Sequence, residues 1–138
     1  MNRRTLSVFG AVDGLVASCG LVLAMAAVSA QAHTVWHAAL GLFVAEGLGM
    51  AVSELLAESN TGWKGAAVMG AATGVPILAI GAPWLFLGRT WATVVSIGVA
   101  LVLAGVIAEL RGARWKSWTE TYGVLIGVSI VAALSGLL

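Results

Sequence analysis

The stretch Leu6–Val28, LSVFGAVDGLVASCGLVLAMAAV, decides the fold of this chain. It exceeds the roughly 20 apolar residues that a helix needs to cross a bilayer core. Its single charged residue is Asp13. A carboxylate within a membrane helix costs several kcal/mol unless it is paired, hydrated or neutralised. The stretch therefore predicts a membrane helix, and Asp13 is a candidate functional residue.

The rest of the chain has the same apolar character. It is 60% hydrophobic and 9% charged, with a mean hydropathy of +1.02, whereas a soluble domain has about 25% charged residues. This composition excludes a soluble globule. We expect an all-α, polytopic membrane protein in which residues 1–138 form a single five-helix transmembrane domain, with spans near residues 6–29, 38–57, 66–87, 91–110 and 121–138.

The basic residues predict the orientation in the membrane. Six of the seven lie at the ends of spans that face the cytoplasm if the N-terminus is inside, and only Arg89 lies in an outer loop. We therefore expect a cytoplasmic N-terminus and an outer C-terminus. Arg3 and Arg4 resemble the start of a signal peptide, but the apolar run after them is too long, so we interpret it as a retained first helix. A net charge of +1 gives no reason to expect nucleic acid as a partner.

Small residues and prolines predict details of the packing. Pairs of glycines spaced i, i+4 present faces that allow close helix contact, at Gly10 and Gly14, Gly70 and Gly74, and Gly123 and Gly127. The first pair brackets Asp13. Pro76 predicts a kink or break around residues 74–76, because proline frees a backbone carbonyl. Trp84 lies deep in the third span and is expected to be a packing residue.

The second apolar segment carries further candidates for chemistry. Glu46, Met50 and Glu54 recur at every fourth residue and share one face of a helix. Asp13 and Met50 each lie about two turns from the inner end of their spans, so we expect them to share a depth. A carboxylate beside a thioether suits a borderline ion such as Fe²⁺, and also Mn²⁺, Co²⁺, Zn²⁺ or Cu, better than Mg²⁺ or Ca²⁺.

Simpler explanations remain open for these residues. Asp13 can accept hydrogen bonds from a neighbouring helix, Met50 can fill the core, and Glu54 can be solvated. Three acids, Glu58, Glu109 and Glu120, lie at cytoplasmic ends and are expected to be solvated or paired with Arg111, Arg114 or Lys116. His33 and His37 are spaced i, i+4 and can bind a metal if helical, but we interpret them as surface residues. No nucleophile–base pair or phosphate loop is present in the sequence, so we expect no enzyme.

Two motifs resemble the vacuolar iron transporter family. The stretch FGAVDGLV, residues 9–16, is similar to the family's first-helix signature G-A-N-D-G-L-V, and GMAVSE, residues 49–54, is similar to its second-helix pattern S-M-A-x-G-E. The third span, with Gly70 and Gly74-Val75-Pro76, also resembles its G-A-x-x-P segment. Val12 replaces the usual Asn, and Ser53 replaces the usual Gly. The acidic cytosolic metal-binding domain of eukaryotic members is replaced here by residues 58–65 alone.

The resemblance implies a homodimeric carrier that exports Fe²⁺, and often Mn²⁺, from the cytosol in exchange for protons. The metal is its transported substrate, and no permanently bound cofactor is expected. The ion path at the dimer interface would be lined by Asp13 and Met50. From their place on the second helix we also expect Glu46 and Glu54 to be metal ligands. Glu54 and Glu58 would relay protons or form a funnel at the cytosolic mouth. Gly10 and Gly14 would let the first helices of the two copies approach at the interface.

Two other classes of function compete with this hypothesis. The chain can be a non-transporting structural or regulatory membrane subunit whose acids bind a partner helix. It can also be a small carrier of organic cations, in which case Met50 has no assigned role. For the exporter we expect a bacterial-type plasma membrane. Transport of Fe²⁺ by the purified protein in liposomes discriminates between these hypotheses.

Overall fold

A computed structural model describes residues 3–57, 62–112 and 114–135 of the chain, which are helical over most of their length. The helices are α1 (Arg3–Ala27), α2 (Ala32–Leu56), α3 (Gly62–Gly81), α4 (Pro83–Phe86), α5 (Arg89–Leu110) and α6 (Trp115–Ser135). Five helical stretches are long and apolar enough to cross a membrane, with α3 and α4 together making the third. The all-α, multi-pass fold predicted from the sequence is confirmed at this level.

Several helices extend beyond the apolar segments that predicted them. The second begins at Ala32 rather than near residue 38, and the last begins at Trp115 rather than near residue 121. The added turns contain polar residues such as His33 and Lys116. A bilayer is about 40–45 Å thick with its headgroup regions but only about 30 Å in its hydrocarbon core. Counting apolar residues finds the part of each helix that crosses the hydrocarbon core. The hydrogen-bonded helix itself continues into the headgroup region.

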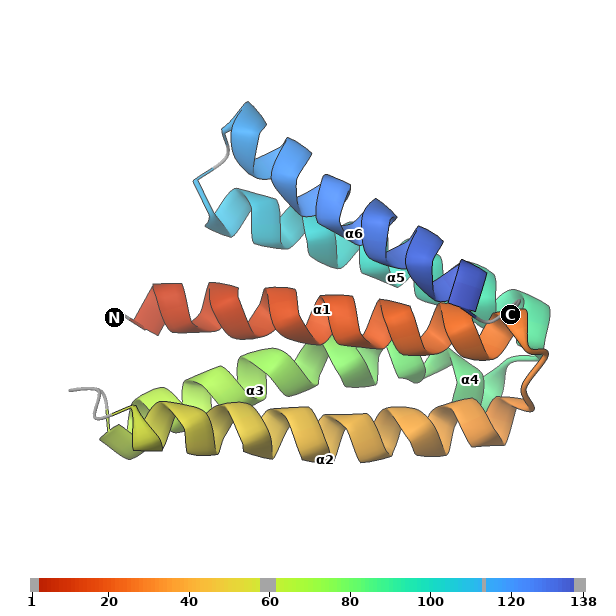
Figure 1. Cartoon of the computed structure of the whole chain (residues 1–138), viewed down its shortest axis with the longest axis horizontal. Helices are drawn as coiled ribbons and strands as arrows, with labels where there is room; N and C mark the ends of the chain where they lie inside the picture. Colours follow the sequence, from red (N-terminus) through yellow and green to blue (C-terminus); the bar gives the residue numbers. More distant parts are fainter. Residues whose placement is uncertain (1–2, 58–61, 113, 136–138) are drawn as a thin grey trace.

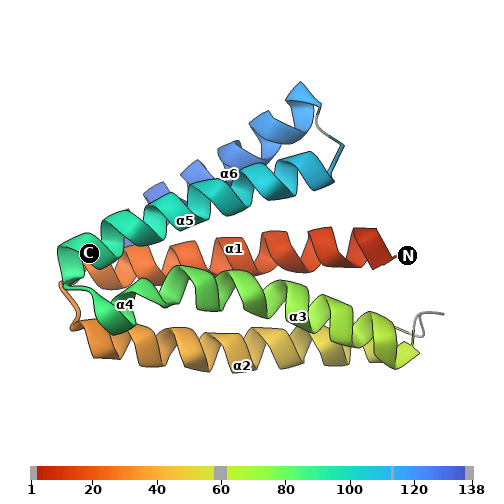
Figure 2. The same cartoon turned by 180° about the vertical axis from the view of Figure 1, so that it is seen from behind.

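The helices form a bundle with α1 in its middle. One side of α1 packs against the pair α2 and α3, and the other side packs against α5 and α6 (Figure 1). The α5–α6 pair diverges from α1 toward the end where α1 begins, and the view from behind shows the same divergence (Figure 2). The starts of α1, α3 and α6 thus lie at one end of the bundle, and α6 ends at the other.

Charge separates between the two ends of the bundle. Arg4, Lys64 and Arg111 belong to the end where α1 begins, together with the α5–α6 connection that carries Arg114, while Arg89 starts α5 at the opposite end (Figure 1). Arg4 donates two hydrogen bonds to the backbone oxygen of Leu110, at 2.7 and 3.1 Å, and so ties the start of α1 to the end of α5. A cation beside the last carbonyls of a helix also interacts favourably with its dipole.

Glycines bring α1 close to α3. A Cβ atom at Gly14 would lie 2.8 Å from the carbonyl carbon of Thr73, and one at Gly10 would lie 2.7 Å from the backbone oxygen of Met69. Real side chains essentially never come this near, so only glycine fits at both positions. The predicted small-residue contact is therefore confirmed, as a contact within one chain. Within one chain this face is occupied by α3, and its assignment to a dimer interface stays a prediction.

The other two glycine pairs differ from one another. A Cβ atom at Gly70 would lie 2.6 Å from the backbone oxygen of Gly47, and one at Gly74 would lie 2.5 Å from the ring of Phe43, so this pair fits α3 against α2. By contrast, a Cβ atom at Gly123, in α6, would meet no atom of the described chain within 4 Å. The spacing alone therefore does not say which small faces are in contact.

The third span breaks at a different proline from the one expected. Helix α3 continues through Pro76, and the interruption falls at Ala82, between α3 and α4, before Pro83. The Ser96 hydroxyl of α5 donates to the backbone oxygen of Ile80, in the last turn of α3, at 2.7 Å, and accepts from the Trp84 indole at 3.1 Å. These bonds satisfy polar groups at the break, as membrane helices require. Trp84 is 1% exposed, which confirms it as a packing residue.

Candidate functional site

Asp13, on the central helix α1, has a carboxylate oxygen without a hydrogen-bond partner among the described residues. The residue is half-buried, and its Oδ2 atom is buried without a hydrogen-bond partner in the described chain. A buried carboxylate oxygen that accepts no hydrogen bond is expensive, and more so at membrane depth. The alternative in which a neighbouring helix simply satisfies this carboxylate is therefore not what the structure shows for Oδ2. The Oδ2 atom can therefore still accept a proton or coordinate a cation.

The helix periodicity places Asp13 at the edge of the α1–α3 contact. Gly10 and Gly14, on either side of it in sequence, are buried against α3. Phe9, one turn before Asp13 and on the same face, is 56% exposed. The Asp13 carboxylate thus lies between the packed face of α1 and an open face, where a ligand or a second chain can approach.

The predicted stripe on α2 changes in exposure along the helix. Glu46 and Met50 are half-buried. Glu54, one turn nearer the end of α2, is only 6% exposed and takes part in a polar or electrostatic interaction. The alternative that Glu54 is simply solvated is therefore wrong. Glu58 lies outside the described residues.

Helix α3 sets the register between α1 and α2. A Cβ at Gly14 of α1 would meet the backbone of Thr73, and a Cβ at Gly74 would meet the ring of Phe43 of α2. Because Thr73 and Gly74 are consecutive, Gly14 and Phe43 lie at nearly the same level of the bundle. This pairing corrects the prediction that Asp13 and Met50 share a depth, because that prediction rests only on counting residues from the ends of the spans.

Asp13 therefore lies nearer in depth to Glu46 than to Met50. Met50 is four residues beyond Glu46, about one turn or 6 Å toward the end where α1 begins. Side chains lean toward the N-terminus of their helix. Since α1 and α2 run in opposite directions (Figure 1), this tilt carries the Asp13 carboxylate and the Met50 sulfur toward a common level. The two residues can still serve one path, with Glu46 beside it.

A single chain does not assemble a full set of strong metal ligands. Over residues 3–57, 62–112 and 114–135, no three His, Cys, Asp or Glu side chains come together in a group that could hold a metal ion. His33 and His37 are helical, as a pair of ligands would require, but both are exposed at the start of α2. The His37 Nδ1 atom lies 2.7 Å from the His33 backbone oxygen, which occupies that nitrogen as a donor.

A stripe of small residues on α2, which is not among the faces predicted above, is exposed. Gly41, Ala45, Gly49 and Ser53 follow one another at every fourth position, and all four are exposed. A Cβ atom at Gly41 or Gly49 would meet no described atom within 4 Å. The spacing was visible in the sequence, but only the structure separates this free face from the occupied face at Gly10.

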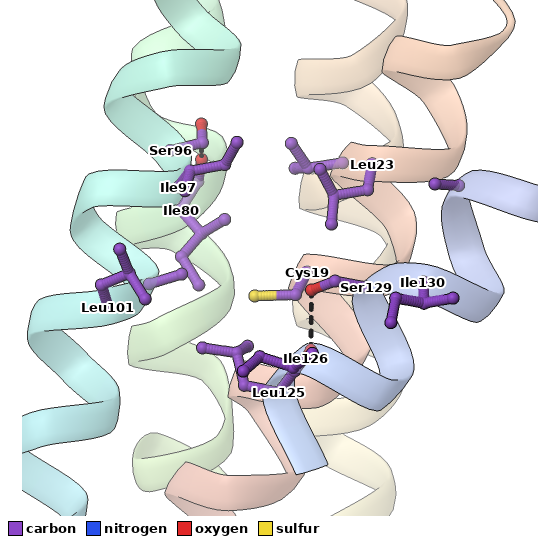
Figure 3. Close-up of a pocket in the computed structure, with 13 residues that line it drawn as sticks. Cys19, Leu23, Ile80, Ser96, Ile97, Leu101, Leu125, Ile126, Ser129 and Ile130 are labelled. Atoms are coloured by element: carbon purple, nitrogen blue, oxygen red, sulfur yellow. Dashed lines mark hydrogen bonds between the residues drawn. The ribbon is translucent and has the colours of Figure 1, made fainter. Parts of the chain in front are cut away.

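The cavity between α1, α3, α5 and α6 is a poor candidate for a metal path. It has a volume of about 390 Å³, and the sulfur of Cys19 points into it (Figure 3). Its hydroxyl groups are already used, since Ser129 donates to the Leu125 oxygen at 2.7 Å and Ser96 donates to the Ile80 oxygen. The remaining lining is apolar. This space suits hydrocarbon better than an ion.

Comparisons of the chain with protein-family models, with curated proteins and with solved structures found no match. The chemistry of the site therefore rests on the geometry of α1 and α2. That geometry offers one carboxylate with an unsatisfied oxygen, an acid and a thioether on the facing helix, and a further buried acid toward one end of the bundle.

Proposed function

We propose that the protein is a proton-coupled exporter of a divalent transition metal ion, with Fe²⁺ as the first candidate and Mn²⁺ as the second. It acts as a homodimer in a bacterial-type plasma membrane, with the N-terminus in the cytoplasm and the C-terminus outside, and it is not an enzyme. The observation that carries this proposal is the buried Oδ2 atom of Asp13, which has no hydrogen-bond partner in the described part of the chain. Its position in a membrane-spanning helix makes a structural role alone costly.

Competition between a metal ion and a proton for one carboxylate can couple metal transport to proton transport. A carboxylate must be deprotonated to bind a metal, so a proton and a metal ion exclude one another at Asp13. The metal ion is released on the side with more protons, and Asp13 is then protonated. The site returns empty and neutral. Met50 contributes a soft sulfur that favours Fe²⁺ over alkaline-earth ions. Glu46, near the level of Asp13, and the buried Glu54 provide further oxygen atoms for a relay.

A second copy of the chain would complete the ligand set. Transition metals in proteins generally take four or more ligands, more than the described residues of one chain bring together. The open stripe of Gly41, Ala45 and Gly49 allows two α2 helices to approach closely. Glu46 and Met50 lie next to this stripe on α2, so a two-fold axis there would double the supply of oxygen and sulfur.

The test is transport by purified protein in liposomes, with Fe²⁺, Mn²⁺ and Zn²⁺ compared under an imposed pH gradient. Asp13→Asn keeps the shape of the side chain and removes its charge, so we expect a folded variant that does not transport. Glu109→Gln is the matched control, since Glu109 is exposed at the end of α5 and should be dispensable. Robust transport by Asp13→Asn would remove Asp13 from the mechanism.

The same assay separates the competing classes of function. A wild-type protein that folds but moves no metal, in either direction of the gradient, would favour the non-transporting membrane subunit. Proton-coupled movement of an organic cation, without metal transport, would favour the third hypothesis. Uptake of Fe²⁺ that collapses with the pH gradient would support the exporter.

A further inference from the structure

A second cavity lies between α1 and α6 where the two helices diverge. Its volume is about 260 Å³. The inner walls are apolar and come from both helices, with Val12, Leu15 and Val16 on α1 and Val124 and Leu125 on α6. None of these residues carries a polar side chain, so this part of the cavity accepts only hydrocarbon.

The polar lining of this cavity is confined to one end. Arg111, Glu120 and Thr121 line it there, at the end of the bundle that carries most of the basic residues. Arg111 donates to the Glu120 carboxylate at 2.6 Å and to the Thr121 hydroxyl at 3.1 Å, and Lys116 lies 3.8 Å from the other Glu120 oxygen. The expected pairing of Glu120 with Arg111 and Lys116 is thus confirmed.

The cations at this end exceed what the local acids neutralise. Arg111 and Glu120 line the cavity mouth and Lys116 lies beside Glu120, so two cations face one acid, which leaves a local charge of +1. The two bonds of Arg111 use two of the five N–H groups that a guanidinium offers. Its side chain is still 31% exposed. An anion can therefore bind at the mouth without breaking the existing ion pair.

We propose that this cavity binds one anionic phospholipid, with an acyl chain between α1 and α6 and the phosphate on Arg111 and Lys116. The order of the lining groups matches such a molecule. The charged groups lie at the end of the bundle, at the level expected for lipid headgroups, and the apolar walls lie toward the bilayer centre. Basic pockets between membrane helices are suited to anionic headgroups. Trp115, 83% exposed beside these cations, is placed as an interfacial anchor.

This binding would also explain how the diverging end of the bundle stays together. The contact between α1 and α6 toward the other end includes Gly20, which lies near Val128. Toward the charged end the cavity separates the two helices. A lipid chain in the cavity would restore the packing that the two helices do not make directly. The protein should therefore be more stable when the lipid is present.

The experiment compares melting of the purified protein in nanodiscs of phosphatidylcholine with melting in nanodiscs that also contain phosphatidylglycerol. Native mass spectrometry then titrates phosphatidylglycerol onto the protein in detergent. The double variant Arg111→Gln, Glu120→Gln removes the ion pair without a change in net charge and leaves no unpaired carboxylate. We expect phosphatidylglycerol to stabilise the wild type, and the double variant to bind it roughly tenfold more weakly, as the loss of a charge-assisted contact implies.

A second pair of variants tests the apolar part of the cavity. Val124→Phe fills it and should abolish retention of phosphatidylglycerol, whereas Val106→Phe, at a similarly exposed position of α5 outside the cavity, should not. Lys64→Gln lowers the net charge at the same end but away from the cavity, and should leave binding unchanged.

Three results would overturn the proposal. The first is equal binding of phosphatidylglycerol by the wild type and the double variant. The second is a loss in Lys64→Gln as large as in the double variant, which would show attraction to charge without a site. The third is stabilisation by inorganic phosphate in the absence of phosphatidylglycerol, which would assign the mouth to free phosphate rather than to a lipid.

Discussion

Replacement of Gly14 by Ala tests the closest helix contact in the bundle. The new Cβ atom would lie 2.8 Å from the carbonyl carbon and 3.1 Å from the Cα atom of Thr73. Carbon atoms pack at about 3.5–4.0 Å, so α1 and α3 would have to separate by roughly 1 Å. Both partners are backbone atoms of α3, which cannot turn aside as the end of a side chain can.

The size of the effect follows from two opposing contributions. Alanine in place of glycine within a helix is favourable by about 0.8–1.0 kcal/mol. Overpacking typically costs about 1–3 kcal/mol, and a gap of 0.5–1 Å forfeits about a quarter to a half of each dispersion contact along the interface. We expect Gly14→Ala to lower the free energy of unfolding by about 2 kcal/mol, the upper end of the difference between these two contributions, since the whole α1–α3 contact must open.

Gly123→Ala is the matched control, because a Cβ atom at Gly123, within α6, would meet no described atom within 4 Å. It should leave stability unchanged or raise it by up to about 1 kcal/mol. The measurement is the unfolding midpoint of each purified variant in mild detergent, with oligomeric state followed by crosslinking. If Gly14→Ala unfolds at the same midpoint as Gly123→Ala and changes only the oligomeric state, the described α1–α3 contact is refuted and the original dimer assignment returns.

Three further predictions concern the site, the helix break and the dimer. Met50→Leu conserves volume, so stability should change by less than about 1.5 kcal/mol, while the initial rate of Fe²⁺ transport should fall more than that of Mn²⁺; equal losses would return Met50 to a packing role. Ser96→Ala should destabilise the protein by about 1–3 kcal/mol, because it leaves the Trp84 indole and the Ile80 oxygen without their partner; an unchanged unfolding midpoint would contradict this. Gly49→Leu should weaken crosslinking between copies without lowering the unfolding midpoint, and an unaffected dimer would exclude the open stripe of α2 as its interface.

The number of spans could be predicted because membrane crossing depends on length and apolarity alone. The position of the break could not. Pro76 and Pro83 each remove a backbone donor, yet α3 continues through the first and stops before the second. The difference lies in the partners, since Ser96 of α5 reaches the Ile80 oxygen near the second proline. That contact depends on tertiary packing, which a single segment does not reveal.

Candidate residues could be found in the sequence more readily than their neighbours. A charged residue such as Asp13 stands out in an apolar run because burial is costly wherever its partners lie. The register of α1 against α2 depends instead on the glycine contacts with α3, so Glu46, and not Met50, lies nearest the level of Asp13. Likewise, the spacing of Gly10 and Gly14 predicts a close partner but contains no information on whether that partner is the same chain.

For the proposed exporter, the tight α1–α3 contact would limit how access to Asp13 alternates between the two sides of the membrane. Gly14 lies against the Thr73 backbone, and Arg4 ties the start of α1 to Leu110, so α1 has little freedom to slide. The α5–α6 pair diverges from α1 at one end (Figures 1 and 2), and the small stripe of α2 is open. Packed interfaces switch between discrete arrangements rather than deform continuously. We therefore expect alternation through movement of α5–α6 or of one copy against the other, with the α1–α3 pair moving as a rigid unit that carries Asp13.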